Sequence, residues 1–314
     1  MSVRLVRVET MNRKPREFLQ LIRLWNLPTA LADSFCGFFI VSAAADIDVR
    51  RAAGAMMVSA LVYAAGMAWN DILDLERDRK LHPHRPLPSG RLRKKAASRF
   101  AAALMLAALI VGLVMGAGIA HLVLLLIVLT FSYNAWSKHA GMLGCLNMGA
   151  CRFVNMWLGI AAAGGAIGDF LPYPVTLGVY VTAATLLSLQ EESNLSRRGF
   201  FVMAAMPVLV LLPPAIVSVL RAGRVPYSWL ALLPLFMLGY RILAAAAAAC
   251  DGVAARAGKP NVGAVVRVAV SGVILLDSAM LFSAGKIIPA AICAGLLVPT
   301  LAFIRLFARR PVAA

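Results

Sequence analysis

Three aspartates and an asparagine stand close together where an apolar segment ends. Residues 54–69 are followed by Asn70, Asp71, Asp74 and Asp78. If one helix continues through this run, at about 100° per residue the four side chains fall within an arc of about 100°. Carboxylates at the end of a membrane helix are costly unless they are neutralised, so the run indicates a functional site. Such oxygen ligands suit Mg²⁺, which typically also binds substrate phosphates. The alternative is a solvated acidic helix end.

A stiff basic connector follows the aspartates. Residues 79–90 contain three prolines and one glycine, which favour a non-helical loop, and they carry Lys80 and Arg85. Acid and base at one membrane face suit a diphosphate, because carboxylates hold Mg²⁺ while Lys and Arg bind the remaining phosphate oxygens. The alternative is a positively charged loop that only pairs with the neighbouring acids.

The composition is that of an all-α polytopic membrane protein. Of the 314 residues, 61% are hydrophobic and 14% are charged, whereas soluble proteins are about half apolar and a quarter charged. Ten apolar segments have spanning length; they lie near 26–45, 54–70, 97–116, 119–136, 145–164, 173–190, 200–220, 228–249, 264–284 and 287–307.

The distribution of Lys and Arg orients these segments. With the N-terminus inside, the inner segments hold 25 of the 31 basic residues and the outer segments hold five. This predicts both termini in the cytoplasm, a basic segment 1–25, one helical bundle 26–307 and a short tail 308–314. The net charge of +17 then needs no nucleic acid to explain it, and membrane lipids account for part of it. We expect the inner membrane of a bacterium.

The run 70–78, followed by residues 85–90 (Arg-Pro-Leu-Pro-Ser-Gly), resembles the first signature of the UbiA superfamily of intramembrane prenyltransferases. Arg23 and Asn26 resemble the family's Arg-x-x-Asn-type start.

Two further segments resemble the family. Tyr133 and Lys138 resemble its Tyr-Ser…Lys element, with Asn134 where serine is usual. Residues 144–155 resemble its fifth-helix entry and carry an arginine and an asparagine, Arg152 and Asn155, as in an EboC-like branch.

The resemblance implies a bundle of nine core helices plus a peripheral tenth, with a central cavity open to the cytoplasmic face. In the family, Mg²⁺ and a prenyl diphosphate bind to two Asp-rich motifs, and the allylic carbocation is captured by an aromatic or other lipophilic acceptor. Metal and cations stabilise the leaving diphosphate, and an apolar cavity protects the carbocation. The implied metal ligands are Asn70, Asp71, Asp74 and Asp78, with Tyr133 beside the reacting carbon; the implied diphosphate ligands are Asn26, Asn70, Lys80, Arg85, Lys138 and Arg152.

The second motif departs from the family, because residues 188–199 contain no aspartate. One interpretation is a modified second site, in which Glu191 binds metal with Glu192 or Asn194. The other is that the second metal is lost. The chain would then be a non-catalytic membrane component that presents a prenylated or lipid precursor to partner proteins. A secondary transporter is disfavoured, because the carboxylates gather at one face instead of the midplane.

Three charged residues fall inside apolar segments, namely Asp33, Arg241 and Asp277. Charges within a membrane often mark function, but they can equally form contacts between helices. For Asp33, lining the cavity and pairing with another helix are about equally favoured.

Overall fold

The computed structural model describes residues 16–43, 46–192, 197–251 and 261–308. Within these ranges the regular structure is entirely helical, as predicted. The helices of the first half are α2 (Leu27–Val41), α3 (Val49–Leu73), α4 (Leu75–Leu81), α5 (Lys94–Met115), α6 (Ala117–Ala135), α7 (Met142–Ala162) and α8 (Ile167–Phe170). Those of the second half are α9 (Pro172–Ser188), α10 (Arg197–Leu209), α11 (Leu212–Arg221), α12 (Leu232–Asp251), α14 (Val262–Ser283), α15 (Ile287–Gly295) and α16 (Leu297–Ala308).

Seven helices in the described ranges are long and apolar enough to cross a membrane. They are Leu24–Val41, Val49–Leu73, Lys94–Met115, Ala117–Ala135, Arg197–Arg221, Ser228–Cys250 and Val262–Ser283. The other three predicted segments also form helices, in α7, α9 and α15 with α16, but they are not among the seven. The number of spans is therefore smaller by this measure than the ten predicted from the sequence.

Two of the predicted spans are interrupted. Segment 200–220 divides into α10 and α11 around Val210 and Leu211. Pro213 and Pro214 lack the N–H groups that would continue the hydrogen bonds of this turn, so the helix breaks here. Segment 287–307 divides into α15 and α16 at Leu296, three residues before Pro299.

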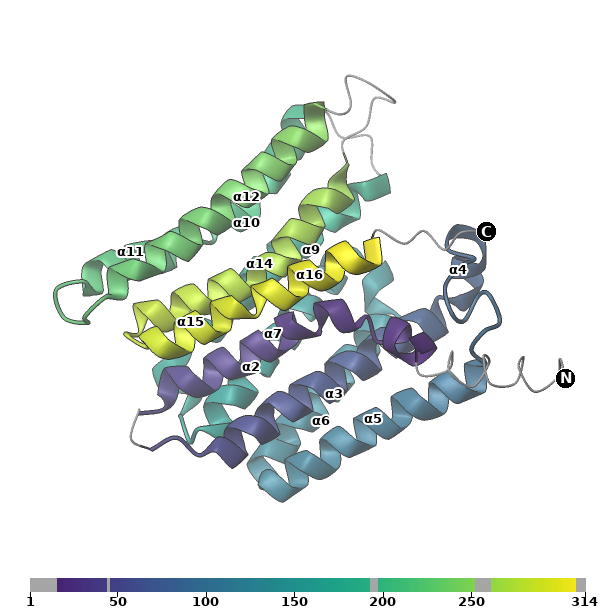
Figure 1. The fold of residues 1–314 in the computed structure, drawn as a ribbon, viewed down its shortest axis with the longest axis horizontal. Coiled ribbons are helices and arrows are strands. Elements are labelled where there is room, and N and C mark those ends of the chain that lie inside the picture. Colours follow the sequence, from purple (N-terminus) through teal and green to yellow (C-terminus); the bar gives the residue numbers. More distant parts are fainter. Residues whose placement is uncertain (1–15, 44–45, 193–196, 252–260, 309–314) are drawn as a thin grey trace, which may run out of the picture.

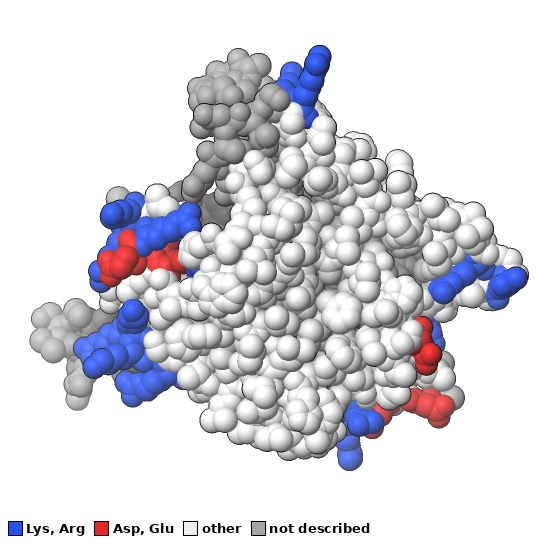
Figure 2. All heavy atoms as spheres, turned by 180° about the vertical axis from the view of Figure 1, so that it is seen from behind, with Lys and Arg blue, Asp and Glu red and all other residues white. Residues whose placement is uncertain are grey.

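The long helices lie side by side, and segments far apart in the sequence become neighbours (Figure 1). Helix α14 packs against α2, α9, α12 and α15, while α2 also packs against α3 and α7. Figure 2 shows a broad uncharged band between two ends that carry the Lys, Arg, Asp and Glu side chains. This distribution is that of a protein embedded in a bilayer.

Helices α2 and α7 approach each other closely through glycine. A Cβ on Gly37 would overlap the backbone oxygen of Met156, and one on Gly159 would overlap that of Ser34. Small residues allow such backbone approach between membrane helices. The contact fixes the position of the polar side chains that α7 directs toward α2.

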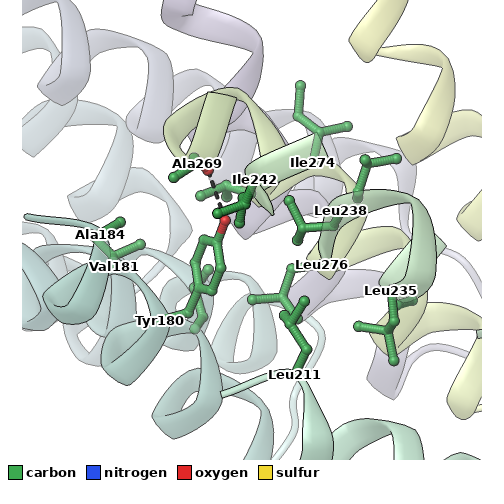
Figure 3. Packing of buried hydrophobic residues seen from close by; sticks show 14 of the residues in the cluster. Tyr180, Val181, Ala184, Leu211, Leu235, Leu238, Ile242, Ala269, Ile274 and Leu276 are labelled. Carbon is green, nitrogen blue, oxygen red and sulfur yellow. Dashed lines mark hydrogen bonds between the residues drawn. The ribbon is translucent and has the colours of Figure 1, made fainter. Parts of the chain in front are cut away.

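A large apolar cluster holds α9, α12 and α14 together (Figure 3). Within it the buried Tyr180 of α9 donates a hydrogen bond from its hydroxyl to the Ala269 carbonyl oxygen of α14, at 2.9 Å. Leu238 and Ile242 of α12 pack in the same cluster. This cluster forms one wall of the cavity described below.

Candidate active site

The aspartates stand at a break between two helices, where the sequence had suggested one continuous helix. Helix α3 ends at Leu73 and α4 begins at Leu75, with Asp74 between them at φ −86° and ψ 8°. The Asp78 N–H still donates to the Asp74 carbonyl oxygen at 2.8 Å. A helical hydrogen bond therefore follows directly after the break. Asp71 and Asp78 are buried, and Asp74 is half-buried.

Two arginines neutralise Asp71 and Asp78. The guanidinium of Arg23, just before α2, lies 2.8 Å from Asp71 Oδ1. Arg85, in the proline-rich connector, lies 2.6 Å from Asp78 Oδ2 and 3.6 Å from Asp71 Oδ1. The connector thus folds back on the aspartates. Both interpretations of the sequence, a diphosphate site and a basic loop paired with the neighbouring acids, predict this contact.

Lys138 neutralises the third aspartate. Its Nζ lies 2.7 Å from Asp74 Oδ1 and 3.4 Å from Asn70 Oδ1, and its side chain is only 10% exposed. Two oxygens from the end of α3 therefore converge on one ammonium group. We call Asn70, Asp71, Asp74, Asp78 and their partners Arg23, Arg85 and Lys138 the acid–base cluster.

The acid–base cluster is electrically balanced, since three carboxylates face three cations. The described residues contain no group of three or more His, Cys, Asp or Glu side chains arranged around one point. The donors are nevertheless hard oxygens, and those of Asn70 and Asp74 already face a common cation. This donor set fits Mg²⁺ if it replaces the Lys138 ammonium.

A cavity of about 380 Å³ lies beside the acid–base cluster and extends between six helices. Arg23 of the cluster lines it together with Asn26 and Tyr133, and so do Arg152 and Asn155 of α7. Apolar walls come from α6, α9 and α14, through Leu126, Val181, Ala184, Val266, Ala269, Val270 and Val273. Such a mixture of apolar walls and a few polar groups is typical of ligand sites.

The remaining predicted site residues lie in three different places. Lys80 is exposed, and among the described residues no hydrogen bond or ion pair joins it to the acid–base cluster. Glu191 and Glu192 end the 3-10 turn Leu189–Glu192, whose side chains at these positions are not described, and Asn194 lies outside the described residues. Their predicted roles in a second site stay predictions.

Arg152 pairs with Asp33 instead of joining the acid–base cluster. Its Nη1 lies 2.9 Å from Asp33 Oδ2, and the Asn155 amide donates to the same oxygen at 2.9 Å. Asp33 is fully buried and is not among the residues that line the cavity. The sequence identified Asp33 as a buried charge but gave no sign of its partner, which lies 119 positions away.

One titratable group beside the acid–base cluster has a shifted pKa. His82, which follows α4, is partly buried next to Arg85. Burial, and then the neighbouring guanidinium, lower the pKa of this imidazole from its ordinary value of 6.5.

Comparisons with known proteins identify the family and the fold. The model of the UbiA prenyltransferase family matches residues 30–210. Digeranylgeranylglyceryl phosphate synthase of Sulfolobus acidocaldarius is 29% identical over 156 residues, which are 50% of this chain and 56% of that protein. The protein of that name from Methanocaldococcus jannaschii is 36% identical over 100 residues, or 32% of this chain and 35% of that one. The chain thus spans about half the length, or less, of these curated relatives.

Solved structures share the fold. A digeranylgeranylglyceryl phosphate synthase structure superposes with a TM-score of 0.59 at 19% identity, covering 88% of this chain and 100% of that one. The apo UbiA homologue of Aeropyrum pernix superposes with a TM-score of 0.60 at 16% identity, covering 81% of this chain and 96% of that one. The Archaeoglobus fulgidus homologue bound to DMAPP and Mg²⁺ superposes with a TM-score of 0.54 at 15% identity, covering 83% of this chain and 99% of that one. Because the family model matches more than half of its residues, the chain belongs to the UbiA prenyltransferase family.

Proposed function

We propose that this membrane protein transfers a prenyl group from a prenyl diphosphate to a lipophilic acceptor, with Mg²⁺ as cofactor. The observation that carries the proposal is the acid–base cluster, which joins three carboxylates and three cations beside a largely apolar cavity. The solved Archaeoglobus fulgidus homologues, described as bound to DMAPP or GPP with Mg²⁺, support this pairing of ligands.

Asn70, Asp71, Asp74 and Asp78 are the residues that would hold Mg²⁺. When bound, the metal supplies positive charge that stabilises the diphosphate as a leaving group. The carboxylates then no longer need their present cations, so Arg23, Arg85 and Lys138 become available to phosphate oxygens. Arginine suits such oxygens because its planar donors can bind two of them at once.

The cavity supplies the second requirement of the reaction. Its apolar walls on α6, α9 and α14 exclude water from a reactive carbocation and accommodate an isoprenoid tail. Tyr133 and Asn26 line the cavity near the acid–base cluster, which is where the first carbon of the prenyl chain would lie. Tyr133 would then lie beside the reacting carbon, and Asn26 would bind the diphosphate.

The acceptor and the membrane are parts of the same proposal. The curated relatives named above are digeranylgeranylglyceryl phosphate synthases, so geranylgeranyl diphosphate is the first donor to test and a glyceryl phosphate lipid is the first acceptor. The excess of basic residues favours both termini in the cytoplasm. Those relatives are archaeal, and the bacterial inner membrane stays a prediction, as do the EboC-like branch and partner proteins.

The atypical segment 188–199 favours a second candidate function. Without aspartates there, the protein could bind a prenyl diphosphate or a prenylated lipid and present it without turnover. Binding alone does not separate the two functions, whereas release of inorganic diphosphate does.

Two measurements on purified protein in lipid nanodiscs test the proposal. The first is binding of geranylgeranyl S-thiolodiphosphate, an analogue that ionises poorly, with Mg²⁺ and with EDTA. The second is release of diphosphate from geranylgeranyl diphosphate with an acceptor panel. We expect Mg²⁺-dependent binding and turnover in the wild type and loss of both in Asp74→Ala. Asp169→Ala, which removes an exposed aspartate on α8, is the matched control.

Each outcome of these measurements has one meaning. Mg²⁺-dependent binding without release of diphosphate from geranylgeranyl diphosphate, whichever acceptor is supplied, would favour the presenting function. No Mg²⁺-dependent binding in folded wild-type protein would overturn prenyl transfer and would leave presentation of a prenylated lipid as the remaining candidate.

A further inference from the structure

The cavity carries a second group of polar side chains, deeper in the membrane than the acid–base cluster. Thr29 of α2, Tyr63 of α3 and Arg152 and Asn155 of α7 line it. Tyr63 precedes Asn70 by seven residues on α3, which is about 10 Å along the helix axis at 1.5 Å per residue. We call these four residues the polar floor of the cavity. A purely hydrocarbon ligand would gain nothing from them.

Arg152 is held firmly in the polar floor. Its Nη1 donates to Asp33 Oδ2 at 2.9 Å and to the Thr29 carbonyl oxygen at 3.0 Å, and its Nη2 donates to Thr29 Oγ1 at 3.2 Å. A guanidinium has five N–H donors, so these bonds leave two for a ligand. Its charge is already balanced by Asp33, which makes it a poor choice for a free diphosphate.

Asn155 provides an acceptor next to this donor. Its amide nitrogen donates to the Ala30 carbonyl oxygen at 2.8 Å and to Asp33 Oδ2 at 2.9 Å. Both partners are acceptors, so the amide cannot be turned around. Asn155 Oδ1 is left without a hydrogen-bond partner among the described residues, although Asn155 is only 5% exposed. Buried polar atoms usually have a partner, so this oxygen indicates a missing donor.

We propose that the polar floor binds a hydroxyl group of the prenyl acceptor. The hydroxyl hydrogen is donated to Asn155 Oδ1, and the hydroxyl oxygen accepts from Arg152. A hydroxyl is both donor and acceptor, whereas an ether or ketone only accepts. An anionic group is disfavoured, because it would lie next to Asp33 and near Asp277, a second buried carboxyl group that faces Asp33. Asp33 is a positioning residue, since it orients both side chains.

This inference rests on the proposed function, because it assigns the acceptor of that reaction. An alcohol and a phenol present the same hydroxyl, so two pairs of probes separate them. The first pair is 1-O-hexadecylglycerol and its dimethyl ether. The second pair is 4-dodecylphenol and its methyl ether. Equilibrium binding of the tritiated probes is measured on full-length protein in nanodiscs with Mg²⁺ and geranylgeranyl S-thiolodiphosphate, and protein-free nanodiscs correct for partition into lipid.

Asn155→Leu is the principal variant. It preserves the size of the side chain. Each of the two oxygens that lose their hydrogen bond from the Asn155 amide still accepts one from another donor. Asp33 Oδ2 still accepts from Arg152, and the Ala30 carbonyl oxygen still accepts from Ser59 at 2.7 Å. Arg152→Lys, which keeps the charge opposite Asp33, is the second variant. Asn147→Leu, on the same helix but outside the cavity lining, is the matched control.

We expect the wild type to prefer the hydroxyl probe over its ether at least about tenfold in one of the two pairs. The preference should fall to about twofold or less in Asn155→Leu, should decrease in Arg152→Lys, and should persist in Asn147→Leu. The pair that shows it identifies an alcohol or a phenol as the acceptor class.

Equal binding of hydroxyl and ether probes by the wild type would overturn the inference, and would mean that a fixed water satisfies Asn155 Oδ1. A preference that survives in Asn155→Leu would also overturn it. The proposed function fails separately, through absence of Mg²⁺-dependent binding of the thiolodiphosphate in the same samples.

Discussion

Replacing Lys138 by methionine should change the binding of metal and of diphosphate in opposite directions. The Lys138 ammonium lies where two oxygens from the end of α3 converge, 2.7 Å from Asp74 and 3.4 Å from Asn70. Mg²⁺ must displace it to reach those oxygens. Methionine removes the competitor but also removes a cation that would otherwise bind phosphate.

The magnitude follows from the burial of the pair. Opposite charges 4 Å apart attract by about 4 kcal/mol at an effective dielectric constant of about 20. Exposed pairs retain about 0.2–1 kcal/mol of this, and breaking a buried pair costs about 3–5 kcal/mol. The two side chains are 10% and 16% exposed, so an intermediate value of about 1–2 kcal/mol applies. The Kd for Mg²⁺ should therefore decrease about 5- to 30-fold.

The loss of a charge-assisted hydrogen bond governs the second effect. Such bonds contribute about 1.5–3 kcal/mol, so the diphosphate analogue should bind about 10- to 150-fold more weakly at saturating Mg²⁺. Calorimetric titration of Mg²⁺ without diphosphate, and then of geranylgeranyl S-thiolodiphosphate with Mg²⁺, measures both constants.

Lys286→Met is the matched control for this prediction. Its amine donates to the Ser42 carbonyl oxygen at the opposite end of the bundle, far from the acid–base cluster. Both constants should stay at wild-type values in the control. Unchanged or weaker Mg²⁺ binding by folded Lys138→Met would refute the idea that the ammonium occupies the position of the metal.

Three further predictions concern stability and are measured by thermal unfolding in detergent. Gly159→Val should lower Tm by several degrees, because the added side chain meets the backbone of α2 and overpacking costs about 1–3 kcal/mol; an unchanged Tm would mean that the two helices separate freely. Tyr180→Phe should cost about 1 kcal/mol by removing the bond to Ala269, without loss of packing, and a larger loss would point to a role beyond that bond. The pKa of His82 in the folded protein lies below its unfolded value of 6.5, so the folded state loses stability relative to the unfolded state as the pH falls below 6.5. His82→Gln should therefore flatten the dependence of Tm on pH between 5 and 7. An unaltered profile would contradict this.

The sequence predicted the acid–base cluster better than the rest of the site. Asp71, Asp74 and Asp78 are close in the chain to Arg85, so the spacing alone brought them together. Lys138 is 64 positions from Asp74, and only the family resemblance connected the two.

The polar floor could not be predicted from spacing. Arg152 and Asn155 meet Asp33 across more than a hundred residues, through a helix contact that depends on the glycines of α2 and α7. The breaks within the apolar segments could not be predicted from the sequence either. Average hydropathy showed one apolar segment at 200–220, because the prolines that interrupt it remove backbone donors while the average stays high.

The packing of α14 and α15 against α2 has a consequence for the order of assembly. The Cys36 thiol donates to the Asp277 carbonyl oxygen, 241 positions later, and Lys286 reaches Ser42 across 244 positions. During synthesis, α2 enters the membrane long before either partner exists. Asp33 therefore first lies against lipid or other early helices, and its surroundings are completed only when α14 arrives. A ribosome-bound chain that stops before α14 should consequently be a better target for membrane proteases than the finished protein.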